Sequence, residues 1–452
     1  MKRRGLVLLL LLVWAWMPMR AQFGVSATIP QLAGQTVWLS AYTGLGVRPV
    51  DSTMVDASGA FTLAQALPTG MYLLEGGPLA LELLSSGKPV QFLMLDTDVP
   101  DAIQFVHSPE NETWTAYLAL RGQYRHQAET LKTVLRQYDP SSAFYQAAKT
   151  EYLDVQQHFQ AVTDSLAGLH DDYAAKLIRA DRELPVDLEM TGQEQRAYLM
   201  AHFLDAIDFN DLSLIPTNVL TTKMIDYLSL TQGLSGFDDP ELAFVVGIDR
   251  ILEKAKVNMT MYEFALEYML MGFTAMGMSR VTDYLLNYPQ LAEGDITSEE
   301  GQRLEQLTLP YQKVRVGAIA PDFEGVTIDG KPYRLYASDA RRILVVFWSV
   351  DCEYCHEFMV NIRKRLNLDR DYQLVTFALA NSQEEVEEAL AELRLPGYHF
   401  YDPKRWDGEA FLEYHITSTP TVFLLDRNKT IVCKPYDWHE LRNFLRNHKR
   451  SL

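Results

Sequence analysis

Cysteine is scarce in this chain. Only three of its 452 residues are cysteines, Cys352, Cys355 and Cys433, and all three lie after residue 350. A chain of this length with so few cysteines does not depend on a framework of disulfides for its stability. Two of the three form a Cys-x-x-Cys pattern, which indicates chemistry rather than cross-linking.

The sequence also has no excess of positively charged residues. The sequence has 41 Lys and Arg residues against 59 Asp and Glu residues, which gives a formal net charge of −18. Nucleic-acid binding depends on basic side chains that neutralise phosphates. We therefore expect no nucleic-acid partner and no basic patch for anionic lipid.

Long apolar runs are absent beyond the N-terminus. Residues 1–21 begin Lys2-Arg3-Arg4, continue with an apolar segment of about 12 residues and end in Ala21, a pattern typical of a secretory signal peptide. A spanning helix needs about 20 apolar residues. Cleavage after Ala21 would leave 37 basic and 59 acidic residues, a net charge of −22. We expect export to the periplasm or cell envelope and no membrane span after cleavage; an uncleaved N-terminal anchor is the alternative.

Residues 22–107 resemble a series of short strands separated by turns. A turn is indicated by Asp56-Ala57-Ser58-Gly59. Regular short strands with Gly and Pro between them predict a β-sandwich. The expected strands include Thr36–Tyr42, Ala60–Leu63, Met71–Leu74 and Gln91–Leu95.

Residues 108–312 have the apolar spacing of helices. From about Asn111 to Leu307, apolar residues recur every three to four positions, which predicts an all-α domain. Prolines punctuate these helices at Pro185, Pro216, Pro240 and Pro289.

Residues 313–452 alternate between strand and helix patterns, which predicts an α/β domain. Helices are expected directly after Cys352, at Glu384–Leu393 and at Trp438–Asn447. The expected strands are Ile343–Phe347, Leu374–Ala378, Tyr398–Tyr401, Thr421–Leu425 and Thr430–Cys433.

The Cys-x-x-Cys follows the buried-strand pattern at Ile343–Phe347 and should begin a helix. Unpaired N–H groups and the positive dipole end at a helix N-terminus stabilise a thiolate. Cys352 is therefore the expected attacking sulfur, and Cys355, one turn later, is placed to resolve a mixed disulfide. This site would need no cofactor and no metal.

Three carboxylates flank the two cysteines, at Asp351, Glu353 and Glu357. Negative charge near the pair disfavours a thiolate and so weakens the dithiol form. We infer a reducing rather than a strongly oxidising couple, although exposed charges are screened by solvent and salt.

These features resemble the thioredoxin superfamily, in particular the envelope branch typified by TlpA and ResA. The matching segments are Gly317–Phe323, Phe347-Trp348, the cysteine pair and Thr419-Pro420-Thr421. The resemblance implies a thiol-disulfide oxidoreductase with Cys352 and Cys355 as catalytic residues. Its implied partners are protein thiols and disulfides and an electron donor in the envelope.

The same resemblance implies how a substrate binds. Pro420 would follow a cis peptide bond beside the two sulfurs, and Thr419 would offer backbone hydrogen bonds to a bound peptide. Trp348 is the third expected substrate-binding residue. Residues 22–107 and 108–312 resemble, more weakly, the β-rich and helical domains that precede thioredoxin modules in exported proteins of Bacteroidota.

The sequence departs from this family at the usual proton acceptors. Phe358 stands where the branch has a glutamate, and Val360 where it has a proline. Val346 replaces the buried aspartate of cytosolic thioredoxins, and Glu357 is one position away from the family's glutamate. Removal of the proton from Cys355 therefore lacks the family's usual acceptors, which leaves water as the candidate.

Three other interpretations are considered. In a peroxiredoxin, Ser349 and Cys352 would fit the motif, but Val345 stands where it needs proline. Half of a zinc site would need a second ligand pair, and Cys433 stands alone. A binding or scaffold protein could keep the thioredoxin fold with little redox activity, as the missing proton acceptors suggest.

Overall fold

The computed structural model describes residues 24–97, 103–106, 108–169, 171–232, 234, 240–288, 299–368 and 370–448. The predicted signal peptide, residues 1–21, lies outside these residues. The described residues pack as two compact units, which fall within Met1–Gln232 with Asp249–Met261 and within Gly233–Ile248 with Tyr262–Leu452. Each unit is described by itself.

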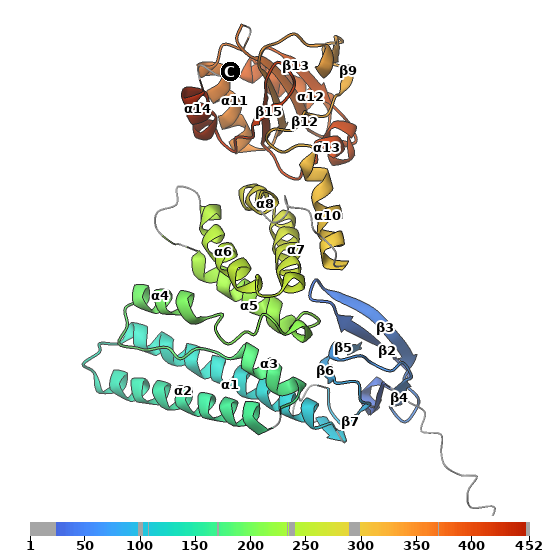
Figure 1. Cartoon of the computed structure of the whole chain (residues 1–452), viewed down its shortest axis with the longest axis vertical. Helices are drawn as coiled ribbons and strands as arrows, with labels where there is room; N and C mark the ends of the chain where they lie inside the picture. The colour runs from blue at the N-terminus through green and yellow to red at the C-terminus, as the bar shows by residue number, and fades with distance from the viewer. Residues whose placement is uncertain are drawn as a thin grey trace, which may run out of the picture. The chain divides into compact units, whose positions relative to one another are not determined.

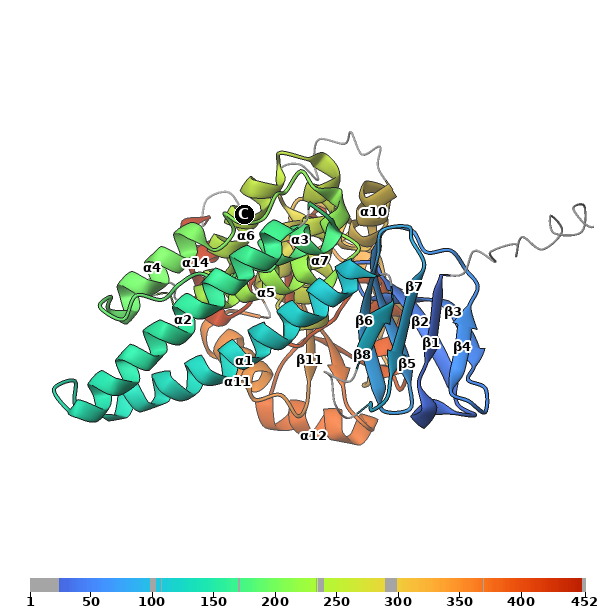
Figure 2. The same cartoon turned by 90° about the horizontal axis from the view of Figure 1, so that it is seen from below.

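The first unit begins with a β-sandwich, as the sequence predicts. Its two four-stranded sheets have the orders β4-β1-β7-β8 and β3-β2-β5-β6 (Figure 2). Apolar side chains of both sheets, such as Val25, Phe92, Leu39 and Leu74, share one core. The strands are β1 (Val25–Thr28), β2 (Thr36–Tyr42), β3 (Val47–Met54), β4 (Ala60–Leu63), β5 (Gly70–Gly76), β6 (Leu79–Ser85), β7 (Val90–Met94) and β8 (Ile103–Val106).

The turn before β4 shows how the sequence directs this fold. The Asp56 carboxylate accepts hydrogen bonds from the backbone N–H groups of Ser58, at 2.8 Å, and Ala60, at 2.9 Å. Gly59 has a φ of +84°, and an added Cβ would lie 2.5 Å from the backbone of Pro30. Only glycine fits this left-handed position, so the predicted turn is confirmed.

Helices follow the sandwich in both units. They are α1 (Pro109–Gln137), α2 (Ala143–Leu169), α3 (Tyr173–Asp181), α4 (Gly192–His202), α5 (Asn218–Thr231), α6 (Ala243–Ala255), α7 (Met259–Ala275), α8 (Ser279–Leu286) and α10 (Glu299–Gln312). The long helices α1 and α2 lie side by side (Figures 1 and 2), and the stacked rings of Tyr124 and Phe159 are 4.2 Å apart. Buried Asn111 joins α1 to β6, because its amide exchanges hydrogen bonds of 2.7 and 2.8 Å with the backbone of Leu84.

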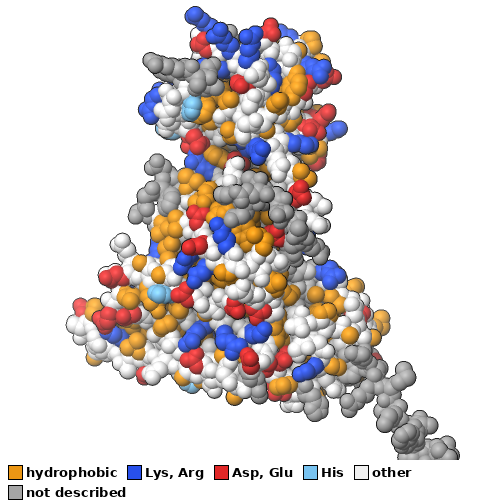
Figure 3. Space-filling view, in the orientation of Figure 1, with side chains coloured by type: hydrophobic (Ala, Val, Ile, Leu, Met, Phe, Trp, Pro, Cys, Tyr) orange, Lys and Arg blue, Asp and Glu red, His pale blue; other side chains and the backbone are white. Residues whose placement is uncertain are grey.

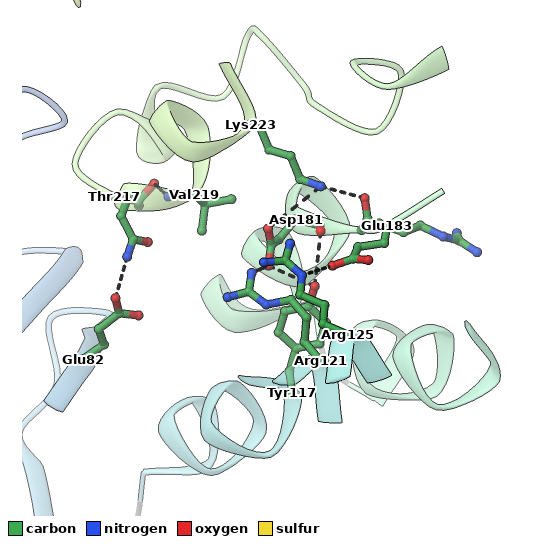
Figure 4. A network of polar contacts seen from close by, with 11 residues as sticks. Glu82, Tyr117, Arg121, Arg125, Asp181, Glu183, Thr217, Val219 and Lys223 are labelled. Carbon is green, nitrogen blue, oxygen red and sulfur yellow. Dashed lines mark hydrogen bonds and ion pairs between the residues drawn. The ribbon is translucent and has the colours of Figure 1, made fainter. Parts of the chain in front are cut away.

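A buried ionic network holds α1, α3 and α5 together (Figure 4). The Asp181 carboxylate, 1% exposed, accepts a 3.0 Å hydrogen bond from the Tyr117 hydroxyl and pairs with Arg121. Lys223, 2% exposed, lies 4.0 Å from Asp181 and donates to the Arg182 carbonyl at 2.9 Å. Burial lowers the pKa of Lys223, and the neighbouring carboxylates oppose this effect.

The second unit ends in a five-stranded sheet with the order β13-β12-β11-β14-β15. Strands β11 (Ile343–Ser349), β12 (Gln373–Leu379) and β13 (Tyr398–Tyr401) are parallel, whereas β14 (Thr421–Leu425) and β15 (Ile431–Cys433) pair antiparallel. All five predicted strands are present. The remaining elements are the hairpin β9 (Glu324–Val326) and β10 (Pro332–Arg334) and the helices α11 (Glu353–Arg365), α12 (Gln383–Leu393), α13 (Glu409–Glu413) and α14 (Trp438–Asn447).

Strand β11 is buried on both faces. Leu344, Val346 and Trp348 belong to the core that α11 and α14 cover, and the alternate residues Val345 and Phe347 belong to the core on the other face. This explains why the strand reads as a continuous apolar run. The predicted architecture of β-sheets, helices and a C-terminal α/β domain is therefore confirmed.

The surface combines both signs of charge. Acidic and basic side chains are interspersed over the face shown in Figure 3, despite the formal net charge of −18. Among the described residues, none of the helices has the length and apolar character needed to cross a membrane.

The ionic network generates a stability prediction. Asp181→Ala leaves Arg121 and Lys223 without their buried carboxylate, so we expect the free energy of unfolding to fall by about 3–5 kcal/mol. The matched control is Glu253→Ala, which removes the exposed partner of Arg250 and should cost less than about 1 kcal/mol. Urea denaturation measures both variants, and equal losses would contradict a structural role for the network.

Candidate active site at the start of helix α11

The two neighbouring cysteines lie where β11 gives way to α11. Cys352 is the N-cap of the helix, with φ −101° and ψ 108°, and its sulfur accepts a 3.1 Å hydrogen bond from the Cys355 N–H. A side chain at this position satisfies one of the N–H groups that a helix leaves unpaired. The sequence therefore places Cys352 where a negative charge on sulfur is stabilised.

Cys352 and Cys355 form a disulfide, and their Cα atoms are 5.2 Å apart. Cys352 is half-buried, whereas Cys355 is completely buried in the core between the sheet and α11. Only the first sulfur is open to another molecule. This difference in exposure agrees with the predicted order of an attacking and a resolving cysteine.

The proline loop meets the first sulfur. The Thr419–Pro420 bond is cis, and the Thr419 carbonyl oxygen lies 3.8 Å from the Cys352 sulfur. Both loop residues are half-buried, and the Thr421 hydroxyl closes the loop with a 2.7 Å hydrogen bond to the Ser418 carbonyl. The structure thus brings together four of the five predicted site residues.

Trp348, the fifth predicted site residue, lies in the core and not at the surface around Cys352. It is completely buried, and its ring centroid is 5.8 Å from that of His356. Its side chain points from β11 into the core under α11. The predicted contact between Trp348 and a substrate finds no exposed surface here, so Trp348 supports the site by packing.

The charged groups around the pair contact the backbone or are exposed to solvent. His356 Nε2 lies 2.8 Å from the Val350 carbonyl oxygen, so a hydrogen on Nε2 is donated to the loop before α11. The three flanking carboxylates at 351, 353 and 357 are exposed. Phe358 is buried in the place where the resembled branch has its glutamate.

Two polar residues in the domain core were not found by sequence reasoning. Thr376 of β12 is completely buried, and its hydroxyl is 2.8 Å from Nδ1 of His399 on β13. Their pairing depends on strand register, and residues 23 positions apart give no local signal for it.

Helix α8 contacts the loop between β15 and α14. The Asp283 carboxylate accepts a 2.6 Å hydrogen bond from the Tyr436 hydroxyl and a 3.1 Å bond from Lys434. A cavity of about 50 Å³ lies beside this contact and is also lined by Thr282 and Pro420. The cis-proline loop and α8 therefore share a boundary that the sequence did not indicate.

The described residues contain no group of three or more His, Cys, Asp or Glu side chains that could hold a metal ion. Cys433, the candidate partner in a zinc site, is a free and buried cysteine of β15.

The chain matches two family models. Residues 158–271 match a domain of unknown function, DUF5106. Residues 333–434 match a thioredoxin-like domain. A comparison with curated proteins found no match.

Several solved structures are similar to parts of this chain. A thioredoxin-like protein from Bacteroides caccae has 18% identity and a TM-score of 0.36, with 59% of this chain and 98% of that one covered. The thioredoxin domain of a thiol-disulfide oxidoreductase from Bacteroides vulgatus has 21% identity and a TM-score of 0.27, with coverage of 29% and 96%. A thiol:disulfide interchange protein from a Bacteroides species has 20% identity and a TM-score of 0.27, with coverage of 30% and 90%.

The family match at residues 333–434 agrees with the strand order around β11 and with the position of the disulfide. The C-terminal part of this chain is a thioredoxin-like domain.

Proposed function

We propose that this protein is a thiol-disulfide oxidoreductase of the cell envelope that reduces disulfides in other proteins. One observation carries the proposal: a half-buried Cys352 and a buried Cys355 form a disulfide at a helix N-terminus, against the cis bond of Thr419–Pro420. The signal-peptide pattern of residues 1–21 supports the envelope location.

The geometry supports a two-step exchange. In the reduced protein, the Cys352 thiolate accepts the hydrogen bond of the Cys355 N–H and attacks one sulfur of a substrate disulfide. The other substrate sulfur leaves as a thiolate, and a mixed disulfide forms at Cys352. Cys355 then attacks Cys352, which restores the internal disulfide and releases the substrate in its reduced form.

The surface around Cys352 suits an extended peptide. The half-buried Thr419 offers its backbone beside the sulfur, as in recognition by strand addition. Tyr354, between the two cysteines, is 79% exposed and offers an apolar ring to a bound chain. Recognition through backbone groups and one ring would accept many protein sequences.

The first prediction tests the exchange itself. Purified full-length protein should reduce insulin with dithiothreitol as donor, and Cys352→Ser should lose this activity because the attacking sulfur is gone. Cys355→Ser should trap the substrate as a mixed disulfide that reductant releases. The control is the Cys352→Ser/Cys355→Ser double variant: if it retains a partner equally well, the protein is a scaffold rather than an oxidoreductase.

The second prediction concerns the selectivity of the thiols. Burial raises the pKa of Cys433 to about 12, so at neutral pH it is a protonated, shielded thiol. Iodoacetamide should therefore label Cys352 in the reduced native protein and leave Cys433 unlabelled until the chain is unfolded. Mass spectrometry of peptides reads the sites, and fast native labelling of Cys433 would refute its assignment to the core.

The third prediction concerns the direction of transfer. We expect the Cys352–Cys355 couple to have a reduction potential near the value of about −270 mV that is typical of thioredoxin. Equilibration with dithiothreitol or glutathione buffers measures it, and a value near −120 mV would reverse the proposed direction. Glu353→Gln, which removes an exposed charge, should shift the potential by no more than about 10 mV because solvent screens that charge.

A further inference from the structure

The cavity of about 50 Å³ beside α8 adjoins the cis-proline loop of the candidate active site. Pro420 and Thr421 form part of its wall. The residue before them, Thr419, places its carbonyl oxygen 3.8 Å from the Cys352 sulfur. Consecutive Cα atoms lie within about 4 Å of each other. The cavity therefore begins one residue along the loop from the point where a substrate sulfur must bind.

Helices that precede the thioredoxin-like domain supply another part of the wall. Thr274 of α7, Asp283 of α8 and Tyr311 of α10 all line the cavity. These residues belong to the same compact unit as the cis-proline loop, but they lie outside residues 333–434, which match the thioredoxin-like domain. The residues of that domain alone therefore enclose the cavity only in part.

Polar and aromatic contacts hold the helical wall against the redox domain. The Asp283 carboxylate accepts a 3.1 Å hydrogen bond from Lys434 and a 2.6 Å hydrogen bond from the Tyr436 hydroxyl. The rings of Tyr311 and His415 pack edge to face, with their centroids 4.1 Å apart. All five residues also line the cavity. A wall that is fixed before a ligand binds selects by shape, because little reorganisation is needed on binding.

The walls of the cavity carry no net charge near pH 7. Among the described residues that line it, Asp283 is the acidic one and Lys434 the basic one, and the two form an ion pair. Burial and the positive charge of Lys434 lower the pKa of His415, so its ring is neutral. A charged side chain that entered this space would lose its hydration without gaining a free partner. The cavity therefore favours uncharged side chains.

The volume of the cavity limits the size of a side chain that fits. One water needs about 10–15 Å³ of such space, so this cavity has room for about three to five waters. The same space suits the few heavy atoms of serine, threonine or valine, whereas an indole ring is much larger. Thr274, Tyr311 and Thr417 add hydroxyl groups to the lining, and a hydroxyl can donate to or accept from a serine or threonine.

We propose that this cavity binds the side chain of a substrate residue next to the disulfide-bonded cysteine, and that it selects small, uncharged side chains. This inference rests on the proposed oxidoreductase function and adds a preference at one substrate position to recognition that is otherwise broad. Thr417 lines the cavity and is exposed, so the cavity opens to solvent at this residue. Successive residues of an extended peptide are about 3.3 Å apart, which brings a neighbour of the substrate cysteine within reach of Pro420.

The experiment uses short peptides that carry one cysteine as a mixed disulfide with thionitrobenzoate. The thiol of thionitrobenzoate is the better leaving group, so attack by Cys352 of reduced full-length protein on the peptide sulfur releases a coloured thiolate. The residue on each side of the cysteine is changed in turn to serine, tryptophan, lysine or glutamate. Each rate is divided by the rate of the same peptide with dithiothreitol, which removes differences in intrinsic reactivity.

We expect a clear preference on one side of the cysteine. There the serine peptide should react about tenfold or more faster than the tryptophan, lysine and glutamate peptides, because a pocket that fits one side chain discriminates by about this factor or more. Equal normalised rates for all peptides in the wild type would overturn this inference. A wild type that releases no thiolate from any peptide and reduces no insulin would instead refute the oxidoreductase itself.

Matched variants link the preference to the cavity. Thr417→Trp places a large ring at the opening and should reduce the ratio of serine to tryptophan rates to within about twofold, whereas Thr417→Ser should keep it. Thr417 is exposed, so its substitution should cost little stability, and melting temperatures check this.

The control for the added ring is Leu412→Trp, at a residue of α13 that is 62% exposed and is not among those lining the cavity. It should keep the wild-type ratio. A ratio that survives in Thr417→Trp, or one that is lost equally in both tryptophan variants, would overturn the assignment of this cavity.

Discussion

The register between β11 and β14 is the constraint on which the site depends. Phe347 pairs with Thr421, so Pro420 is brought beside the loop that carries Cys352, although 68 residues separate the two in sequence. A shift of one residue would exchange the faces of the strand and move Trp348 out of its core. Burial on both faces opposes such a shift, because each alternate side chain already fills a packed core. Apolar packing on both faces of β11 therefore fixes the positions of Cys352 and Pro420 at the surface.

Two electrostatic effects act on Cys352 in opposite directions. The backbone N–H of Cys355 lies 3.1 Å from its sulfur, and a charge at a helix N-terminus gains about 0.3–1 kcal/mol, or up to about 2 kcal/mol in a partly buried geometry. The carboxylates of Asp351, Glu353 and Glu357 act through solvent from exposed positions, where the effect of a charge is small. The fixed hydrogen bond therefore dominates, and the carboxylates adjust the thiolate's stability without preventing its formation.

Much of this architecture was predictable because its signals are local. The apolar run at 343–347, the cysteine pair and the helix at 438–447 each carry a pattern within about ten residues, and the structure places them as expected. Strands such as β3, which is mostly exposed, lack an apolar pattern and were missed. Trp348 was expected to bind substrate, but the alternation of β11 turns its side chain into the core.

Contacts between residues that are far apart in the sequence could not be predicted, for a physical reason. The hydrogen bond between Thr376 and His399 exists only because β12 and β13 pair in one register. Neither residue forms a recognised motif, and a lone histidine in a strand usually indicates nothing beyond packing. The same holds for Asp181 and Lys223, which meet through the packing of α3 against α5. Such partners become visible only when the elements are placed in space.

Helix α8 lies outside the five-stranded sheet and the helices that cover it, but it contacts the thioredoxin-like domain directly. Burial and the nearby Asp283 carboxylate raise the pKa of Tyr436 far above its usual value, so its hydroxyl keeps its proton and continues to donate to Asp283 across the physiological pH range. Lys434 donates to the same carboxylate, and Arg280 of α8 pairs with Asp437 at 3.1 Å. These bonds fix α8 beside the loop that follows β15, next to the cavity lined by Pro420. The described helices after residue 262 and the redox domain therefore pack as one unit, and α8 shares the lining of a cavity with the cis-proline loop.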